Sequence, residues 1–193
     1  MSGGQSPGWS TLQSEALYAS PHLQVFHERI ATPSRPEGVD WQVVRRRTAA
    51  VVAPRTPDGR FLLLRQERAA VRRTLWEFPA GQVDGDGGPD AEPVRAAAER
   101  ELGEEAGVRC EGGWISLGGF YSSVGFTDEF CHLFLARDVV PRPDGPSHDA
   151  QEAILEVRAF TPSELEDLIA SGEIVDANTL AAYARMRAKG VFS

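Results

Sequence analysis

The segment AAAERELGEEAG, residues 96–107, constrains the fold of this chain more than any other feature. Its alanine, leucine, glutamate and arginine content favours a helix, and Gly107 suits the position just beyond a helix C-terminus. Glu101, Glu104 and Glu105 then crowd the last turn, where like charges three or four residues apart repel each other and the helix dipole is already negative. Local helix energetics oppose this arrangement, whereas a divalent cation that prefers oxygen ligands, such as Mg2+, would stabilise it.

An alternative interpretation is a solvated acidic helix face. Arg95, Arg100 and Arg109 are close enough in the sequence to neutralise the glutamates, and the cluster taken alone favours this alternative. The residues around the cluster are therefore needed to decide between the two interpretations.

The composition excludes several classes of function. The 193 residues include 20 Lys and Arg against 28 Asp and Glu, a net charge of −8, which disfavours duplex nucleic acid as a partner. No apolar run approaches the roughly 18 residues of a membrane span, and the N-terminus lacks the basic and apolar regions of a signal peptide. Two cysteines, Cys110 and Cys131, fit a reducing compartment. We expect a cytoplasmic protein with no nucleic-acid or membrane partner.

Turn and periodicity signals divide the chain into three parts. Residues 1–14, rich in Gly, Ser and Pro, are expected to be a flexible tail. Residues 15–47 hold two expected strands, 23–30 and 41–47, which form an antiparallel hairpin. Residues 48–193 are expected to form the main domain, with strands at 48–54, 61–68, 76–83, 114–123, 129–139 and 153–161 and helices at about 91–106, 161–173 and 176–190. This pattern predicts the α/β (α+β) class, with helices packed against a central sheet.

The carboxylate helix and the segment before it resemble the Nudix box. That family pattern is Gly, five residues, Glu, seven residues, then Arg-Glu, an aliphatic residue, any residue, Glu-Glu, any residue, Gly and an aliphatic residue. Here Glu92 is followed by seven residues and then by RELGEEAGV, residues 100–108, which matches throughout. Ten residues instead of five separate Gly81 from Glu92, and the excess falls in DGDGGPD, residues 84–90. Because such a loop tolerates insertion, we interpret it as a lengthened loop before an intact helix.

The resemblance implies a Nudix-type α/β/α sandwich with a mixed central sheet, and it implies roles for particular residues. Glu101, Glu104 and Glu105 would bind Mg2+ or Mn2+, and the backbone carbonyl of Ala80 would complete the metal site. Arg100 would orient the cluster. In the family the metal bridges diphosphate oxygens and positions water, so the three glutamates and Arg100 are the catalytic candidates.

Sequence beyond the box, from about residue 23 to 189, resembles the ADP-ribose pyrophosphatase branch of the family. The stretch RQERAAVRRTLWEFPAG, residues 65–81, is similar to the Arg-Gln-x-Arg and WE-x-PAG motifs of that branch. The resemblance implies that Arg68 holds substrate phosphates or ribose, and Glu77 is a second substrate-binding candidate. It also implies a homodimer whose N-terminal strands reach the partner's site, where Trp41 would stack on the base and Arg46 is a similar candidate. The alternatives are a surface ion pair for Arg68 and a hairpin anchor packed on the core for Trp41.

Two departures from the branch bear on specificity and on the catalytic base. Val124 stands where the ADP-ribose branch has its marker proline. The position that matches the family's catalytic glutamate is not acidic here, but Glu152 lies one residue away and is the expected base. Asp149 and the box glutamate Glu104 are the other candidates.

We therefore predict a Mg2+- or Mn2+-dependent enzyme that hydrolyses the diphosphate bond of ADP-ribose or a related nucleotide-sugar, giving AMP and a sugar phosphate. Val124 leaves other nucleoside diphosphate derivatives open, namely GDP-mannose, a dinucleoside polyphosphate or coenzyme A. A non-catalytic nucleotide sensor is the alternative from a different class. Such proteins often lose box acids and carry a DNA-binding region, whereas this acidic chain keeps every box acid.

Overall fold

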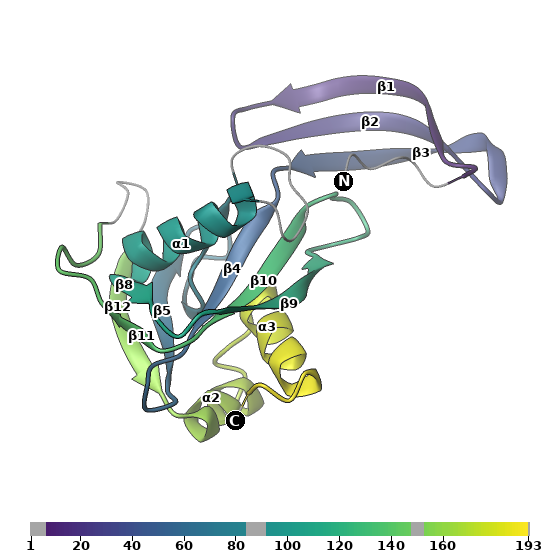
Figure 1. Ribbon diagram of the computed structural model, residues 1–193. Helices are drawn as coiled ribbons and strands as arrows, with labels where there is room; N and C mark the ends of the chain where they lie inside the picture. The colour runs from purple at the N-terminus through teal and green to yellow at the C-terminus, as the bar shows by residue number, and fades with distance from the viewer. Residues whose placement is uncertain (1–6, 84–91, 148–152, 193) are drawn as a thin grey trace.

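The computed structural model describes residues 7–83, 92–147 and 153–192 (Figure 1). In this part of the chain the strands are β1 (Ser10–Ala19), β2 (Leu23–Thr32), β3 (Arg35–Arg46), β4 (Ala49–Pro54), β5 (Phe61–Arg68), β6 (Arg73–Glu77), β7 (Ala80–Gln82), β8 (Val108–Cys110), β9 (Trp114–Tyr121), β10 (Phe130–Ala136), β11 (Val139–Pro141) and β12 (Ile154–Phe160). The helices are α1 (Glu92–Ala106), α2 (Pro162–Ala170) and α3 (Ala177–Ala188). The strands pair in the orders β7-β4-β10-β9, β12-β5-β6, β1-β2-β3 and β11-β8.

Strand β4 lies at the centre of the main domain, and every one of its residues is buried. Its side chains alternate between two cores, as a strand covered on both faces requires. Val52 packs in the core that contains Leu102 of α1, whereas Val51 packs with Leu165 of α2 and Met186 of α3. Strand β4 pairs parallel with β10 and antiparallel with β7, so the sheet is mixed. This α/β/α arrangement confirms the predicted fold class (Figure 1).

The N-terminal sheet corrects the predicted tail. Strand β1 begins at Ser10, so residues 10–14 pair with β2 and are not part of a loose tail. All ten residues of β1 are exposed, because this sheet projects from the main domain (Figure 1). A strand exposed on both faces needs no alternation of apolar and polar residues, which is why periodicity did not reveal it. The predicted hairpin is present as β2 and β3, with a shorter connecting turn than expected.

The carboxylate helix, α1, ends where the sequence predicts. Gly107 follows it with a φ of 66°, a left-handed conformation that glycine adopts without strain. The lengthened loop predicted at residues 84–90 lies outside the described residues.

The two C-terminal helices both begin with side-chain caps. Thr161 and Glu164 form a capping box at the start of α2, in which each side chain accepts the other residue's backbone N–H. Asp176 caps α3 by accepting the N–H of Thr179. Within the described ranges, none of the helices combines the length and the apolar character that crossing a membrane requires.

Two short strands differ from the prediction. The expected strand at 76–83 is divided into β6 and β7 by Phe78 and Pro79, because proline has no N–H to donate to a strand ladder. Strand β8 pairs with β11 and was not predicted, since three residues are too few to show a periodic pattern.

Candidate active site

The segment that joins β6 to β7 is fixed by backbone hydrogen bonds. Phe78 donates its N–H to Oγ1 of the fully buried Thr179 in α3, at 2.9 Å. The carbonyl of Pro79 accepts the N–H of Val52 in β4, also at 2.9 Å. Contacts from the central sheet and from α3 therefore set the position of Ala80, whose carbonyl is the predicted metal ligand.

Two glutamates of α1 reach this segment. Glu105 accepts the N–H of Ala80 through Oε2, at 2.9 Å. The carboxylate of Glu101 lies against Gly81, since a Cβ built on Gly81 would stand only 1.6 Å from Glu101 Oε1. Both glutamate residues are 3% exposed. Glycine is required at position 81 because a carboxylate occupies the space that a side chain would fill.

Arg100 joins the glutamates of the box to each other. Its Nη1 donates to Glu104 at 2.7 Å, and its Nη2 lies 2.7 Å from Glu101 and also donates to the carbonyl of Gln82. Burial would lower the pKa of Arg100, but the hydrogen bond to Glu104 and the charges of both carboxylates raise it above its ordinary value. Arg100 thus stays charged and orients the cluster, as the resemblance implies.

Two other arginines near the helix form ion pairs outside the cluster. Arg95 and Arg109 pair with other glutamates. A cation that the sequence did not indicate, Arg142, lies against Gly103, where its Nη1 would be 2.0 Å from an added Cβ. This guanidinium offsets the negative end of the α1 dipole. The alternative of a solvated acidic face is wrong for α1, since two of its three clustered carboxylates are buried.

A cavity of about 430 Å³ opens beside Ala80 and Gly81, and Arg68 and Glu77 line it. Arg68 donates from Nε to both carboxylate oxygens of Glu77, at 2.9 and 3.0 Å, and from Nη2 to one of them. Glu77 is buried, whereas the side chain of Arg68 is 40% exposed. The hydrogen bond to Glu77 raises the pKa of Arg68 above its ordinary value. Arg68 is therefore a permanently charged, oriented cation in the cavity wall.

Arg46 lines the same cavity and is also paired. Its Nη1 lies 3.0 Å from Oε1 of Glu129, and its backbone N–H donates to Asp128 at 3.1 Å. Cys131 is a further lining residue. Burial, with the charge of Glu129 as a smaller cause, raises the pKa of the Cys131 thiol to about 12. A thiol with such a pKa is a poor nucleophile at neutral pH, so we assign it no chemical role.

The first turn of α3 completes the lining of the cavity, through Asp176, Ala177 and Asn178. Burial raises the pKa of the Asp176 carboxyl to about 6. The N–H of Thr179 opposes this shift, and the nearby charge of Glu77 adds to it. Asp176 is thus a cap whose charge is poorly compensated, at the edge of the cavity that holds Arg68.

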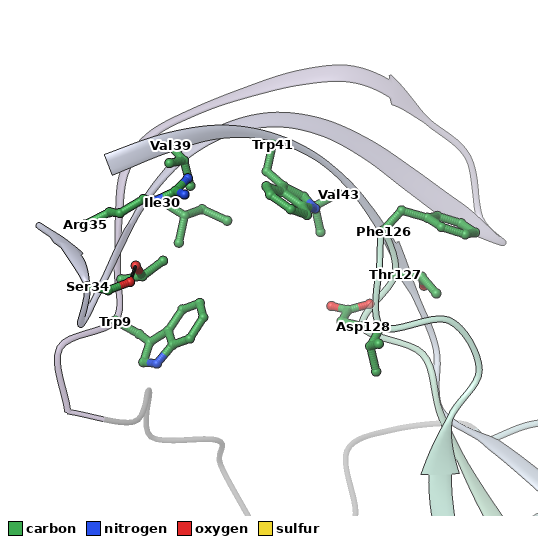
Figure 2. Close-up of a pocket in the computed structure, with 12 residues that line it drawn as sticks. Trp9, Ile30, Ser34, Arg35, Val39, Trp41, Val43, Phe126, Thr127 and Asp128 are labelled. Carbon is green, nitrogen blue, oxygen red and sulfur yellow. Dashed lines mark hydrogen bonds between the residues drawn. The ribbon is translucent and has the colours of Figure 1, made fainter. Parts of the chain in front are cut away.

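Trp41 lies in a different hollow. Its indole N–H donates to the carbonyl of Gly125 at 2.9 Å, and the residue is 48% exposed, so it is not packed on the core. Figure 2 shows it with Trp9 around a hollow of about 470 Å³, which Val124 also lines. Arg46 lies five positions after Trp41 along β3, roughly 17 Å at about 3.4 Å per residue. Trp41 therefore lines a different hollow from the cavity of Arg46 and Arg68 in the same chain.

Two predicted base candidates, Glu152 and Asp149, lie outside the described residues. The neighbouring Ala153 is described, and its carbonyl accepts the N–H of Glu67 in β5 at 3.1 Å. Ala153 also borders a small cavity next to Arg68. The described chain thus resumes at Ala153, close to Arg68.

Within residues 7–83, 92–147 and 153–192, no three carboxylate, imidazole or thiol side chains converge into a ready-made metal site. Arg100 binds Glu101 and Glu104 here, which holds their carboxylates on its guanidinium. The chemistry of the donor set nevertheless fits a hard cation, because three carboxylates and the carbonyl of Ala80 are oxygen ligands of the kind that Mg2+ and Mn2+ prefer.

Sequence reasoning missed Glu129 and Asp176 as residues of the cavity. Each has a local signal: Glu129 precedes an apolar strand, and Asp176 stands three residues before Thr179, the spacing of an N-cap. Neither signal indicates that the two acids lie near Arg68, since only the tertiary fold brings these segments together.

The model of the NUDIX domain family matches residues 44–183. The chain is 29% identical to the ADP-ribose pyrophosphatase of Bacillus subtilis (strain 168), over 90% of this chain and 89% of that protein. It is 29% identical to the ADP-ribose pyrophosphatase of Mycobacterium tuberculosis (strain ATCC 25618 / H37Rv), over 90% and 80%. It is also 29% identical, over 89% of each chain, to the methanol dehydrogenase activator of Bacillus methanolicus.

Among solved structures, the chain is similar to the crystal structure of an ADP compounds hydrolase. The TM-score is 0.74 at 19% sequence identity, and the match covers 97% of this chain and 99% of the other. At this identity the likeness supports the fold, including the N-terminal sheet, since nearly the whole of both chains is covered.

Proposed function

Because this chain belongs to the NUDIX domain family, we propose that it hydrolyses the diphosphate bond of ADP-ribose or a related nucleotide-sugar, releasing AMP and a sugar phosphate. One observation carries the proposal: buried carboxylates and an oriented guanidinium meet around one short segment. Glu101 and Glu105 contact Gly81 and Ala80, and the cavity beside these two residues has Arg68 in its wall. A bound diphosphate requires both kinds of group, one to hold a cation and one to hold phosphate oxygens directly.

The metal site of this proposal consists of Glu101, Glu104, Glu105 and the carbonyl of Ala80. When bound there, Mg2+ or Mn2+ would neutralise diphosphate oxygens and lower the pKa of a water molecule. The contact between Glu105 and the N–H of Ala80 supports this assignment, because it fixes the carboxylate next to the carbonyl ligand. Arg100 positions the other two glutamates.

Arg68 holds the diphosphate through paired N–H donors. The Nε and Nη2 atoms of Arg68 donate to Glu77. Within the described residues Nη1 has no hydrogen-bond partner, so the N–H groups of Nη1 are free to donate to phosphate oxygens. Glu77 is 4% exposed and holds the guanidinium of Arg68 in place, so it contributes to substrate binding by positioning Arg68. Arg46 adds a second positive charge to the wall of the cavity.

In the reaction, water attacks one phosphorus atom, the bond to the bridging oxygen breaks, and the leaving phosphate departs with that oxygen. Glu152 takes the proton of the attacking water in this proposal. The place of Ala153 beside Arg68 supports Glu152, because the next residue in the chain is anchored at the site. Asp149 and Glu104 remain the other candidates.

A hydrolysis screen tests the proposal. ADP-ribose, GDP-mannose, a diadenosine polyphosphate and coenzyme A are incubated with the enzyme and Mg2+ or Mn2+, and the products are identified by chromatography. We expect ADP-ribose to give AMP and ribose phosphate. If another compound is cleaved preferentially, that compound replaces ADP-ribose as the proposed substrate, and the proposed hydrolysis of a diphosphate bond stands. Tight binding of ADP-ribose with no cleavage would favour a non-catalytic sensor. The screen is needed because the dehydrogenase activator and the two pyrophosphatases are each 29% identical to this chain.

We also propose a homodimer in which the partner covers the N-terminal sheet. Leu12, Leu17 and Tyr18 of β1 are each about half exposed, as is Trp41, which is a large apolar area for a free surface. In such a dimer Trp41 would serve the partner's substrate, since it does not line the cavity that holds Arg68 in its own chain. Sedimentation analysis of the wild type and of Leu17→Glu tests this, with a monomeric wild type as the contrary result.

A cytoplasmic location completes the proposal. The supporting observation is that Cys110 and Cys131 form no disulfide.

A further inference from the structure

The turn between β5 and β6 borders the smaller cavity, of about 340 Å³, that Ala153 and Arg68 also line. Arg68, Arg72, Arg73 and Thr74 line it together with Glu67. Three guanidiniums thus gather around one small cavity in a chain whose net charge is −8.

The three guanidiniums of this turn outnumber the one carboxylate, Glu67, that lines the cavity with them. Arg68 is paired with Glu77, but Arg72 and Arg73 are exposed and form no ion pair with any described carboxylate. Arg73 stands directly opposite Arg68 in the β5–β6 register. Like charges in such a cross-strand pair destabilise a sheet, so local energetics oppose the arrangement and a bound anion would offset it.

The backbone conformation of the turn is a second argument for a bound anion. Arg72 has a φ of 54°, in the left-handed region that costs a non-glycine residue roughly 1 kcal/mol. The N–H groups of Val71 and Arg72 donate to the carbonyls of Arg68 and Ala69, both at 3.2 Å, which holds the turn in this shape. Glycine or asparagine would meet the backbone requirement at lower cost, so an arginine here is best explained by its guanidinium.

Arg68 is the link between the two cavities, because it lines both. A substrate that places its diphosphate beside Ala80 and Arg68 can therefore continue past Arg68 to the turn. Guanidinium groups bind phosphate oxygens through paired N–H donors, and the hydroxyl of Thr74 supplies a further donor.

We propose that Arg72 and Arg73 form a subsite for a phosphomonoester that the substrate carries outside its diphosphate. A phosphomonoester has close to two negative charges at neutral pH, which matches two unpaired guanidiniums. This inference rests on the proposed function and narrows it to nucleoside diphosphate compounds with a third phosphate group.

Two matched pairs of compounds test the subsite: ADP-ribose 2′-phosphate against ADP-ribose, and coenzyme A against dephospho-coenzyme A. Binding is measured by calorimetry in metal-free buffer with EDTA, so that the result does not depend on turnover. For at least one pair we expect the phosphorylated compound to bind the wild type about tenfold more tightly, and the preference to weaken as salt is raised. The double variant Arg72→Ser/Arg73→Ser should lose the preference.

The matched control is Arg60→Ser/Arg158→Ser, which removes the same charge from the opposite end of the β5–β12 pair. This control should keep the tenfold preference. The proposed subsite would be overturned if the wild type bound both members of each pair with equal affinity. It would also be overturned if the control variant lost the preference for the phosphorylated compound as fully as Arg72→Ser/Arg73→Ser. Hydrolysis of ADP-ribose by the wild type is assayed separately, so a failed subsite and a failed proposed function give different results.

Discussion

Substitution of Gly81 by alanine separates the catalytic arrangement from the stability of the fold. The new Cβ would stand 1.6 Å from Oε1 and 2.0 Å from Cδ of Glu101. Non-bonded heavy atoms approach to roughly 3.5 Å, so the carboxylate must move by about 2 Å. The backbone of Gly81 does not occupy the left-handed region, so the alanine itself adds no strain there.

The magnitudes follow from what the displaced carboxylate loses. Glu101 is buried and pairs with Arg100 at 2.7 Å, so disturbing that contact is expected to lower the free energy of unfolding by about 1–3 kcal/mol. A misplacement of about 1 Å at a catalytic site can lower the rate by about 100-fold. For Gly81→Ala we therefore expect kcat/KM for ADP-ribose to fall at least about 100-fold, with the fold retained.

The assay combines steady-state hydrolysis at saturating Mg2+ with urea denaturation followed by circular dichroism. Gly125→Ala is the control, because a Cβ on Gly125 meets nothing within 4 Å, and its stability should stay within about 0.5 kcal/mol of the wild type. If Gly81→Ala keeps the kcat/KM of the wild type, the argument that Glu101 must lie against residue 81 is refuted.

Three further predictions concern the walls of the cavity. Thr179→Val leaves the buried N–H of Phe78 without its acceptor and should lower the free energy of unfolding by about 1–3 kcal/mol in urea titrations. Thr179→Ser retains the hydroxyl and should keep most of the wild-type free energy of unfolding. Burial raises the pKa of Asp176 from 3.8 to about 6, so the folded state disfavours the charged carboxylate. Asp176→Asn should therefore raise the free energy of unfolding by up to about 3 kcal/mol above pH 6 and leave it unchanged below pH 4. An equal effect at pH 4 and pH 8 would contradict this. Arg68→Lys should lower kcat/KM about 10- to 100-fold, since lysine cannot donate in pairs, whereas Arg65→Lys, at an exposed position of the same strand, should have no effect; equal losses in the two variants would remove the special role of Arg68.

The sequence predicted those parts of the fold whose pattern is local. The central strand β4 is a short apolar run buried on both faces, and α1 has both helix composition and a terminating Gly107. Strand β1 was missed because neither of its faces packs on a core, so nothing in its composition had to alternate. Its existence depends on pairing with β2, which is a tertiary property.

The candidate site was predictable in its helix and less so in its surroundings. The spacing of Glu101 and Glu105 places both carboxylates on one face, and that face is buried against β7. The sequence could not show that Arg142, far along the chain, covers the end of α1, or that Asp176 lies near Arg68. Such contacts depend on how separate segments meet, and no local pattern records them.

Equilibrium binding of Mn2+, measured by electron paramagnetic resonance in the presence of ADP-ribose, tests the central claim most directly. The account predicts that the wild type binds Mn2+ at the carboxylate cluster. Glu105→Gln, which keeps an oxygen to accept the N–H of Ala80 but lacks the charge, should lose most of that affinity while remaining folded. Equal Mn2+ affinity in both proteins, or no bound Mn2+ in the wild type, would contradict the assignment of these glutamates to a metal-dependent hydrolase site.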